Sequence, residues 1–284
     1  MATGATTGAA DVADGSPVSS RGAVGILVLP PRLTGSARRV AAAAEDRGLT
    51  TLQCPTFEVP AHVVATTAAR YLHAGPSFAD ATADVLRIGL LEAPLDWLTT
   101  LPRDLTHRHI RAMTLHEAHR LRSPVFVKTP NDKRIAARVY TDGTRLPGAD
   151  AVDAGTRVLV SDVVTYVAEF RLHVLDGRVH AASRYAQDGR LEVAAASPDA
   201  LAFADDLLAH VGPTLPSAIV VDVGLDSDGR WSVVEANAAW ASGSYAADAD
   251  RVLDVVLRAA GPLSEVRSSD RAFLRRGDLR GPRT

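Results

Sequence analysis

Short apolar runs alternate with amphipathic stretches along most of the chain, and this order is typical of an α/β protein. The first apolar run, residues 24–29, ends at two prolines and predicts a buried strand. A helix capped by Ser36 is predicted to run through Arg47, and a second strand is predicted at residues 49–52. This strand–helix–strand opening indicates a Rossmann-like unit. No GxGxxG motif lies between the first strand and its helix, which argues against a dinucleotide site there.

The pattern changes after Pro124, where strand-like runs predominate. The elements expected in this second part are strands at residues 125–128, 158–161, 167–175 and 178–184, a helix at residues 198–211, a hairpin over residues 218–235 and an amphipathic helix at residues 247–260. We therefore expect a first domain at residues 23–123 and a second, largely antiparallel domain at residues 124–262. Residues 1–22 predict a disordered polar tail, and residues 263–284 predict a basic, flexible tail.

Composition and charge narrow the class of protein. The 284 residues carry a formal net charge of −2, whereas a protein held on nucleic acid by phosphate contacts normally has a basic excess. The single cysteine excludes an internal disulfide, and no apolar run is long enough to span a membrane. The N-terminal residues lack a secretory signal pattern. These features predict a cytoplasmic protein with no nucleic-acid or membrane partner.

Lysine is rare in this arginine-rich sequence. Among the 31 basic residues only Lys128 and Lys133 are lysines, and they lie on either side of a Thr-Pro-Asn-Asp turn. Two ammonium groups around a turn suit the binding of a polyphosphate, because each is a compact point charge. The segment has no P-loop motif, and solvated lysines beside a turn are the alternative interpretation.

The hairpin at residues 218–235 contains the clearest candidate metal site. If Asp228 and Gly229 form a two-residue turn, Asp222 lies directly opposite Glu235. Like charges in such a pair destabilise a sheet unless a cation lies between them. Asn237 follows two residues after Glu235 and so falls on the same face. These oxygen ligands suit Mg²⁺, and an exposed, solvated acidic hairpin is the alternative.

A second Asp-Gly pair, at residues 176–177, predicts another two-residue hairpin. In that register Glu169 faces Arg184 across the two strands, and Arg171 and His173 share the face of Glu169. An opposite-charge pair of this kind contributes about 0.2–1 kcal/mol if its role is only structural. A charged, solvent-facing sheet is therefore one interpretation, and a polar site beside the candidate metal site is the other.

Three segments in this order resemble the nucleotide-binding half of ATP-grasp proteins: FVKTPNDKR, VLVSDVVTYVAEFR and VVDVGLDSDGRWSVVEANAAWASGSY. The similarity is greatest to a divergent bacterial clade that has an arginine-to-lysine exchange in the ATP site. Many members of that clade end in a WxSGxY segment, which matches Trp240, Ser242, Gly243 and Tyr245. The resemblance implies a Rossmann-like pre-ATP-grasp domain, followed by a two-lobed ATP-grasp domain built from antiparallel sheets.

The resemblance also implies ATP and Mg²⁺ as cofactors and a role for each matching position. The positions implied to contact the ATP phosphates are Lys128 and Lys133. The hinge and adenine positions are Ser161, Asp162, Val163 and Val164, and the ribose position is Glu169. The residues implied to steady the transferred phosphate are Arg171 and Arg184. The implied Mg²⁺ ligands are Asp222, Glu235 and Asn237.

ATP-grasp enzymes mostly activate a carboxylate as an acyl phosphate, which an amine then attacks. The resemblance therefore implies an ADP-forming ligase for small-molecule or peptide carboxylates and amines, and it makes a homodimer plausible. Two departures bear on the substrate class: the loop after Lys128 has no glycine run, and Asp162 stands where many relatives have glutamate. The alternatives are a non-catalytic ATP-binding regulator or scaffold, and a small-molecule kinase on the same fold. Trp240 and Tyr245 either border an acceptor pocket or pack in the core.

Overall fold

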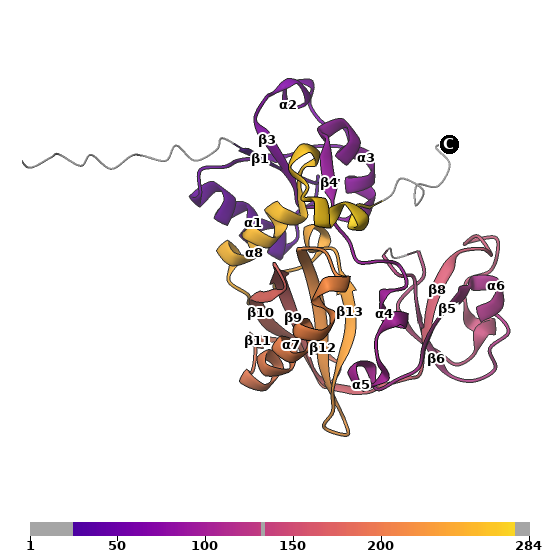
Figure 1. The fold of residues 1–284 in the computed structure, drawn as a ribbon. Helices are drawn as coiled ribbons and strands as arrows, with labels where there is room; N and C mark the ends of the chain where they lie inside the picture. The colour runs from indigo at the N-terminus through magenta and orange to yellow at the C-terminus, as the bar shows by residue number, and fades with distance from the viewer. Residues whose placement is uncertain (1–24, 132–133, 276–284) are drawn as a thin grey trace, which may run out of the picture.

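The computed structural model describes residues 25–131 and 134–275, and it begins with a small parallel sheet (Figure 1). Its three strands run in the order β2-β1-β3, with bounds Gly25–Leu29 (β1), Thr50–Gln53 (β2) and Ala69–Leu72 (β3). The helices of this part are Gly35–Asp46 (α1), Ala61–Ala65 (α2) and Pro76–Leu86 (α3). The predicted Rossmann-like opening is confirmed. The cap of its first helix is Thr34 rather than Ser36, because Thr34 accepts a 3.1 Å hydrogen bond from Ala37 N.

A second, four-stranded antiparallel sheet forms a small lobe with the strand order β5-β8-β6-β7. The bounds are Ile110–Thr114 (β5), Val125–Lys128 (β6), Arg138–Tyr140 (β7) and Arg157–Ser161 (β8), and the short helices near it are Trp97–Thr100 (α4), Arg103–Thr106 (α5) and Leu115–Ala118 (α6). Strand β5 precedes the predicted domain boundary at residue 123, yet it pairs with β8. The small lobe therefore takes its strands from both sides of that boundary.

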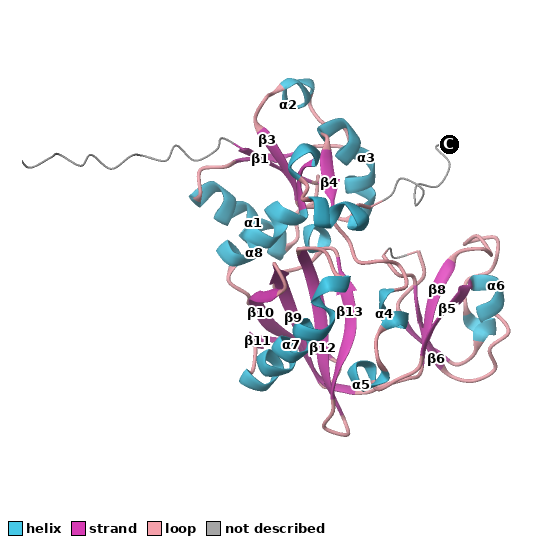
Figure 2. Cartoon of the chain, viewed as in Figure 1, coloured by secondary structure: helices cyan, strands magenta, loops and turns pink. Residues whose placement is uncertain are grey.

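The largest sheet has five antiparallel strands in the order β11-β10-β9-β12-β13 (Figure 2). Their bounds are Tyr166–Leu175 (β9), Arg178–Gln187 (β10), Arg190–Ala195 (β11), Ala218–Asp226 (β12) and Trp231–Asn237 (β13). Helix α7, Pro198–Val211, covers one face, where Phe170, Leu172 and Val221 pack beneath it in the core. Helix α8, Ala249–Ala259, contacts the other face and also α1, so it joins this sheet to the N-terminal part.

Residues 260–275 return to the N-terminal part of the fold. Strand β14, Ala260–Pro262, pairs with β4, Ile88–Leu90, and short 3₁₀ helices follow at Leu263–Glu265 and Ser268–Phe273. Arg275 then donates to Asp80 at 2.7 and 3.0 Å and to Glu92 at 2.7 Å. Residues 263–275 thus differ from the flexible tail predicted there, because ion pairs and backbone pairing hold them. Residues 276–284, like residues 1–24, lie outside the described part of the chain.

The fold class predicted from the sequence is confirmed: a parallel N-terminal sheet is followed by two antiparallel sheets. Three further 3₁₀ helices lie in connections, at Gly143–Arg145, Gly212–Thr214 and Ala239–Ala241. Within the described ranges, no helix has the length and apolar character needed to cross a bilayer. The segment of residues 162–165 links β8 of the small lobe directly to β9 of the large sheet.

Candidate functional site

Side chains from both antiparallel sheets meet in one polar cluster. Lys128 reaches it from the end of β6, and Arg171 extends from β9. Asp222 on β12 and Glu235 and Asn237 on β13 complete it. The cluster thus joins the small lobe to the large sheet, and it unites five residues that the sequence singled out.

The predicted pairing of Asp222 with Glu235 is confirmed, but the path to it differs from the prediction. The turn spans residues 227–229, because Asp226 N donates to Arg230 O and the register beside the turn pairs Leu225 with Trp231. A β-bulge farther along then inserts one extra residue in β13. The longer turn and the bulge shift the register by one residue in opposite directions, so the expected pair forms.

Glu235 is held by two donors. Lys128 Nζ donates to one carboxylate oxygen, and Asn237 Nδ2 donates to the other at 2.6 Å. Burial alone would raise the pKa of Glu235, but the adjacent Lys128 ammonium lowers it to about 2. Glu235 is therefore an anion at neutral pH, and its side chain is still 26 % exposed.

Asp222 is fully buried and forms a two-point ion pair with Arg171. Arg171 Nε donates to Asp222 Oδ1 at 2.9 Å, and Nη2 donates to Oδ2 at 2.6 Å. Asn237 Nδ2 also lies 3.3 Å from Asp222 Oδ2, so its amide touches both carboxylates. Removing one partner of such a pair leaves an uncompensated buried charge, so the two side chains depend on each other.

Aromatic rings surround Arg171 on its open side. The rings of Tyr185 and Tyr245 stack with centroids 5.2 Å apart, and the Arg171 guanidinium lies 5.5 and 5.3 Å from those centroids. Tyr185 also donates a 2.7 Å hydrogen bond to Glu169. Burial raises the pKa of Glu169, and this hydrogen bond opposes the rise. The sequence analysis missed Tyr185, because a tyrosine within a strand is ordinarily a packing residue.

The WASGSY segment serves both of the purposes that the sequence left open. Trp240 is fully buried and donates its indole N–H to Leu91 O at 2.8 Å, so it packs in the core. Tyr245 instead lies at the cluster, with a left-handed backbone (φ 46°). Arg39 of α1 donates to its carbonyl oxygen, and this contact holds the strained residue against the N-terminal part.

The residues predicted to form the hinge lie at the junction of the two lobes. Ser161 ends β8, and Asp162 begins the four-residue link to β9. Asp162 Oδ2 accepts a 2.9 Å hydrogen bond from His109 N, and the side chain of Val163 is exposed. Val164 is half-buried. Their adenine-binding role stays a prediction.

The predicted contact between Glu169 and Arg184 is wrong. Register shifts in β10 place Arg184 opposite Phe170 and place Ala186 opposite Glu169. A slip of one residue moves a side chain to the other face of a sheet, so Arg184 lies on the face that carries Phe170. There it donates to Gln187 at 2.9 Å and to Glu192 at 2.6 Å. These contacts do not bring Arg184 to the cluster, so the phosphate role implied for Arg171 is not extended to it.

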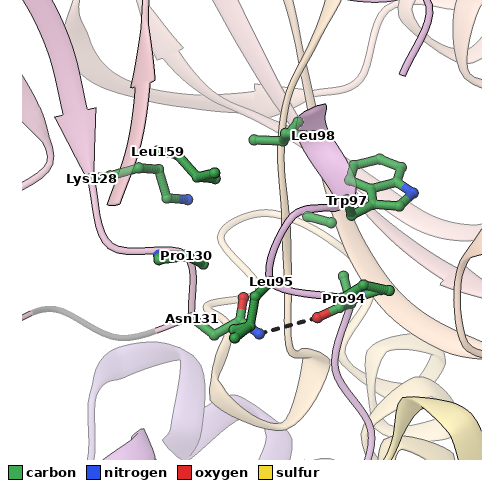
Figure 3. Close-up of a pocket in the computed structure, with 10 residues that line it drawn as sticks. Pro94, Leu95, Trp97, Leu98, Lys128, Pro130, Asn131 and Leu159 are labelled. Carbon is green, nitrogen blue, oxygen red and sulfur yellow. Dashed lines mark hydrogen bonds between the residues drawn. The ribbon is translucent and has the colours of Figure 1, made fainter. Parts of the chain in front are cut away.

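A shallow pocket borders the cluster on the small-lobe side (Figure 3). Lys128 and Asn131 line one wall, and Trp97 and Leu98 of α4 line another. Asn131 Nδ2 donates to Ala93 O at 3.1 Å, which ties the loop after β6 to the chain before α4. Lys133, the other predicted phosphate contact, lies outside the described residues.

The donor set fits a divalent cation. Glu235, Asp222 and Asn237 bring hard oxygen ligands to one point, as Mg²⁺ requires. No group of three or more His, Cys, Asp or Glu side chains in the described ranges forms a metal cage, so phosphate oxygens would have to complete the shell. In this structure Lys128 and Arg171 supply the compensating positive charge. Glu235 is the more accessible carboxylate for a metal, because both oxygens of Asp222 already bind Arg171.

His173 lies behind the cluster and makes the fold sensitive to acid. It is fully buried, and within the described part of the chain neither ring nitrogen has a hydrogen-bond partner. Burial lowers its pKa to about 3, and the neighbouring Arg171 contributes to this shift. An ordinary histidine titrates near pH 6.5, so the unfolded chain binds a proton that the folded chain excludes. The free energy of unfolding therefore falls as the pH drops below about 6.5.

We expect His173→Leu to reduce the loss of stability between pH 7 and pH 5 by up to about 1.4 kcal/mol per pH unit. Urea unfolding at several pH values measures this slope. His116→Leu is the control, because His116 lies on the surface helix α6 and its titration should leave the slope unchanged. A slope equal to that of the natural sequence in His173→Leu would contradict the assignment.

Comparison with solved structures identifies the fold. A D-alanine--D-alanine ligase from Bacillus anthracis is 13 % identical in sequence, with a TM-score of 0.51 over 84 % of this chain and 97 % of that chain. The same ligase complexed with ATP gives a TM-score of 0.53 at 13 % identity, again over 84 % and 97 % of the two chains. A RimK domain ATP-grasp protein from Sphaerobacter thermophilus is 17 % identical, with a TM-score of 0.50 over 82 % of this chain and 99 % of that chain. At these identities the matches show the ATP-grasp fold.

The family is shown by the sequence itself. The model of a family of ATP-grasp domains, the second family of the clade with the arginine-to-lysine exchange, matches residues 105–255. These residues span the small lobe, the large sheet and most of α8. The chain therefore belongs to this ATP-grasp family. No curated protein matches the sequence.

Proposed function

We propose that this protein is an ATP-dependent ligase that joins a carboxylate to an amine and releases ADP and phosphate. The observation that carries the proposal is the cluster itself: two cationic and two anionic side chains converge with Asn237 between two antiparallel sheets. The charges in it are balanced pairs, so an incoming polyphosphate and its metal can each take a partner of opposite sign. The ATP-grasp family is consistent with this chemistry.

The proposed mechanism depends on positioning and charge compensation. Lys128 exchanges its bond with Glu235 for an ATP phosphate, and Arg171 steadies the phosphoryl group as it passes to the substrate carboxylate. Glu235 and Asn237 would hold Mg²⁺ with Asp222 beside them, and the ion would neutralise phosphate charge. The resulting acyl phosphate is attacked by the amine, whose nitrogen forms the amide bond as phosphate leaves. Residues 161–164 and Glu169 would bind adenine and ribose.

The nucleotide site can be tested without knowledge of the substrate. We expect ATP with Mg²⁺ to raise the melting temperature by roughly 5–10 °C at one hundred times its Kd, because ligand at that ratio adds about 2.7 kcal/mol. Differential scanning fluorimetry with ATP, ADP and neither, each with and without Mg²⁺, measures the shift. An unchanged melting temperature at millimolar MgATP would contradict the proposed nucleotide site.

The ligase step is tested by product analysis. Hydroxylamine is a small amine that converts an acyl phosphate into a hydroxamate, so it replaces an unknown amine substrate. We would incubate the protein with MgATP, hydroxylamine and a panel of amino acids and short peptides, and measure ADP and hydroxamate together. Equal amounts of both products support ligation. A phosphorylated acceptor would instead support a kinase.

One observation favours a second candidate, a nucleotide-binding protein without turnover. Asp222 is wholly buried and both of its oxygens bind Arg171, so one of the three proposed metal ligands is already occupied. A regulator of this kind would show the MgATP-dependent rise in melting temperature but no ADP release with any carboxylate. The same two measurements therefore separate the two functions.

A further inference from the structure

The β-bulge in β13 decides which face Glu235 and Asn237 occupy. Val223 faces Val233, whereas the next residue toward the strand start, Asp222, faces Glu235, so Val234 is the extra residue. Without that residue, Val234 would face Asp222 and Glu235 would face Val221. Val221 belongs to the hydrophobic core beneath α7. The bulge is therefore what directs both proposed metal ligands toward Asp222.

A buried arginine binds the bulge from outside the sheet. Arg108 lies between α5 and β5 and is only 8 % exposed. Its Nη1 donates to Val233 O at 2.7 Å, and its Nη2 donates to Val234 O at 2.9 Å. Strand β13 is the edge of the five-stranded sheet, so Arg108 supplies donors where no neighbouring strand of that sheet does. The two carbonyls that it binds belong to the residues at the bulge.

Tyr166 connects Arg108 to the strand on the other side of the bulge. Arg108 Nη1 donates to the Tyr166 hydroxyl at 2.8 Å, and that hydroxyl lies 2.9 Å from Ser232 Oγ. The Tyr166 ring crosses Gly224, where a Cβ atom would lie only 2.5 Å from a ring carbon. Gly224 faces Ser232 in the register, so the ring, the glycine and the hydroxyl together fix the position of β13 just before the bulge.

We infer that Arg108 is a positioning residue for the reaction, since its guanidinium holds the bulge that turns Glu235 and Asn237 to the face of Asp222. The inference rests on the proposed function, because it assigns those two residues to Mg²⁺. The hydrogen bonds of Arg108 go to neither the metal ligands nor the phosphate-binding side chains. It acts through the backbone of Val233 and Val234, and it lies near the beginning of the segment that matches the family.

Three substitutions test this inference. Arg108→Met removes both donors, Arg108→Lys keeps one cationic donor, and Tyr166→Phe removes only the connecting hydroxyl. We expect Arg108→Met to raise the Mg²⁺ concentration needed for half-maximal nucleotide-induced stabilisation by about 10–100-fold, as for other residues that support metal ligands. Tyr166→Phe should show a smaller rise, and Arg108→Lys should restore part of the affinity. Amide hydrogen exchange should show lost protection confined to β12 and β13.

Arg70→Met is the matched control. Arg70 also donates to backbone carbonyls, those of Val63, Val64 and Thr66, but in the N-terminal part. It should lower the melting temperature without changing the Mg²⁺ dependence. If Arg108→Met and Tyr166→Phe both keep the natural Mg²⁺ dependence while the natural protein binds MgATP, the inference is overturned and the proposed function stands. If Arg108→Met does not fold, Tyr166→Phe and Arg108→Lys decide alone. If the natural protein itself shows no Mg²⁺-dependent binding, the proposed function fails first.

Discussion

Glu235→Gln is expected to reduce Mg²⁺-dependent ATP turnover by roughly 10²–10³-fold while the protein stays folded. Glutamine keeps the size of the side chain but removes the charge that Lys128 neutralises and that a metal would bind. Because the pKa of Glu235 is lowered to about 2, this charge is present across the neutral range in the natural protein. Initial rates of ADP release at increasing Mg²⁺, together with circular dichroism, measure the effect.

Glu192→Gln is the control for this variant. Glu192 lies on edge strand β11, its side chain is 59 % exposed, and it pairs with Arg184 rather than with the cluster. Its loss should leave turnover within about twofold of the natural rate, since exposed ion pairs contribute little. Natural turnover in Glu235→Gln would remove Glu235 from the proposed metal site and leave the paired charges a structural role.

Asp222→Asn is expected to lower the free energy of unfolding by about 3–5 kcal/mol, the cost of leaving a buried charge without its partner. The Arg171 side chain is only 12 % exposed, so water cannot replace the carboxylate. For a chain of this length the melting temperature should fall by roughly 6–20 °C. Urea and thermal unfolding of the natural protein and the variant measure both quantities.

A double variant separates the ion pair from simple loss of packing. Asp222→Leu with Arg171→Met removes both charges, and it should recover much of the lost stability because no unpaired charge remains. Asp250→Asn is the control: Asp250 is 62 % exposed and pairs with Arg47 on the surface, so its loss should cost less than about 1 kcal/mol. A melting temperature for Asp222→Asn within about 2 °C of the natural protein would contradict the buried-pair argument.

Local patterns predicted the hairpins and their faces. The Asp176-Gly177 turn forms as expected, with both residues at positive φ and Leu175 opposite Arg178. Helix α7 has the predicted bounds, Pro198–Val211, since Ser197 caps it and apolar residues recur at helical spacing. Such features depend on neighbouring residues in the sequence, which is why pattern and turn chemistry suffice for them.

Register over longer distances could not be predicted in the same way. Bulges in β10 moved Arg184 to the opposite face from the one that its distance to the turn predicted. The pairing of Asp222 with Glu235 was predicted correctly only because a longer turn and a bulge compensate. A glycine within a strand, Gly224, is the one local sign of a close approach or a bulge there. Arg108 has no sign of its own, because nothing around it in the sequence distinguishes it from a surface arginine.

The packing of residues 260–275 against the N-terminal part has a consequence for biosynthesis. Leu274 bridges to Leu91, and Arg275 binds Glu92 across a sequence separation of 183 residues. At a translation rate of about 5–20 residues per second, the β4 region waits roughly 9–37 s for its partners to be made. During that interval the edge of β4 and two carboxylates remain without their final contacts. The N-terminal sheet therefore reaches its native state only after the nucleotide-binding lobes have been synthesised.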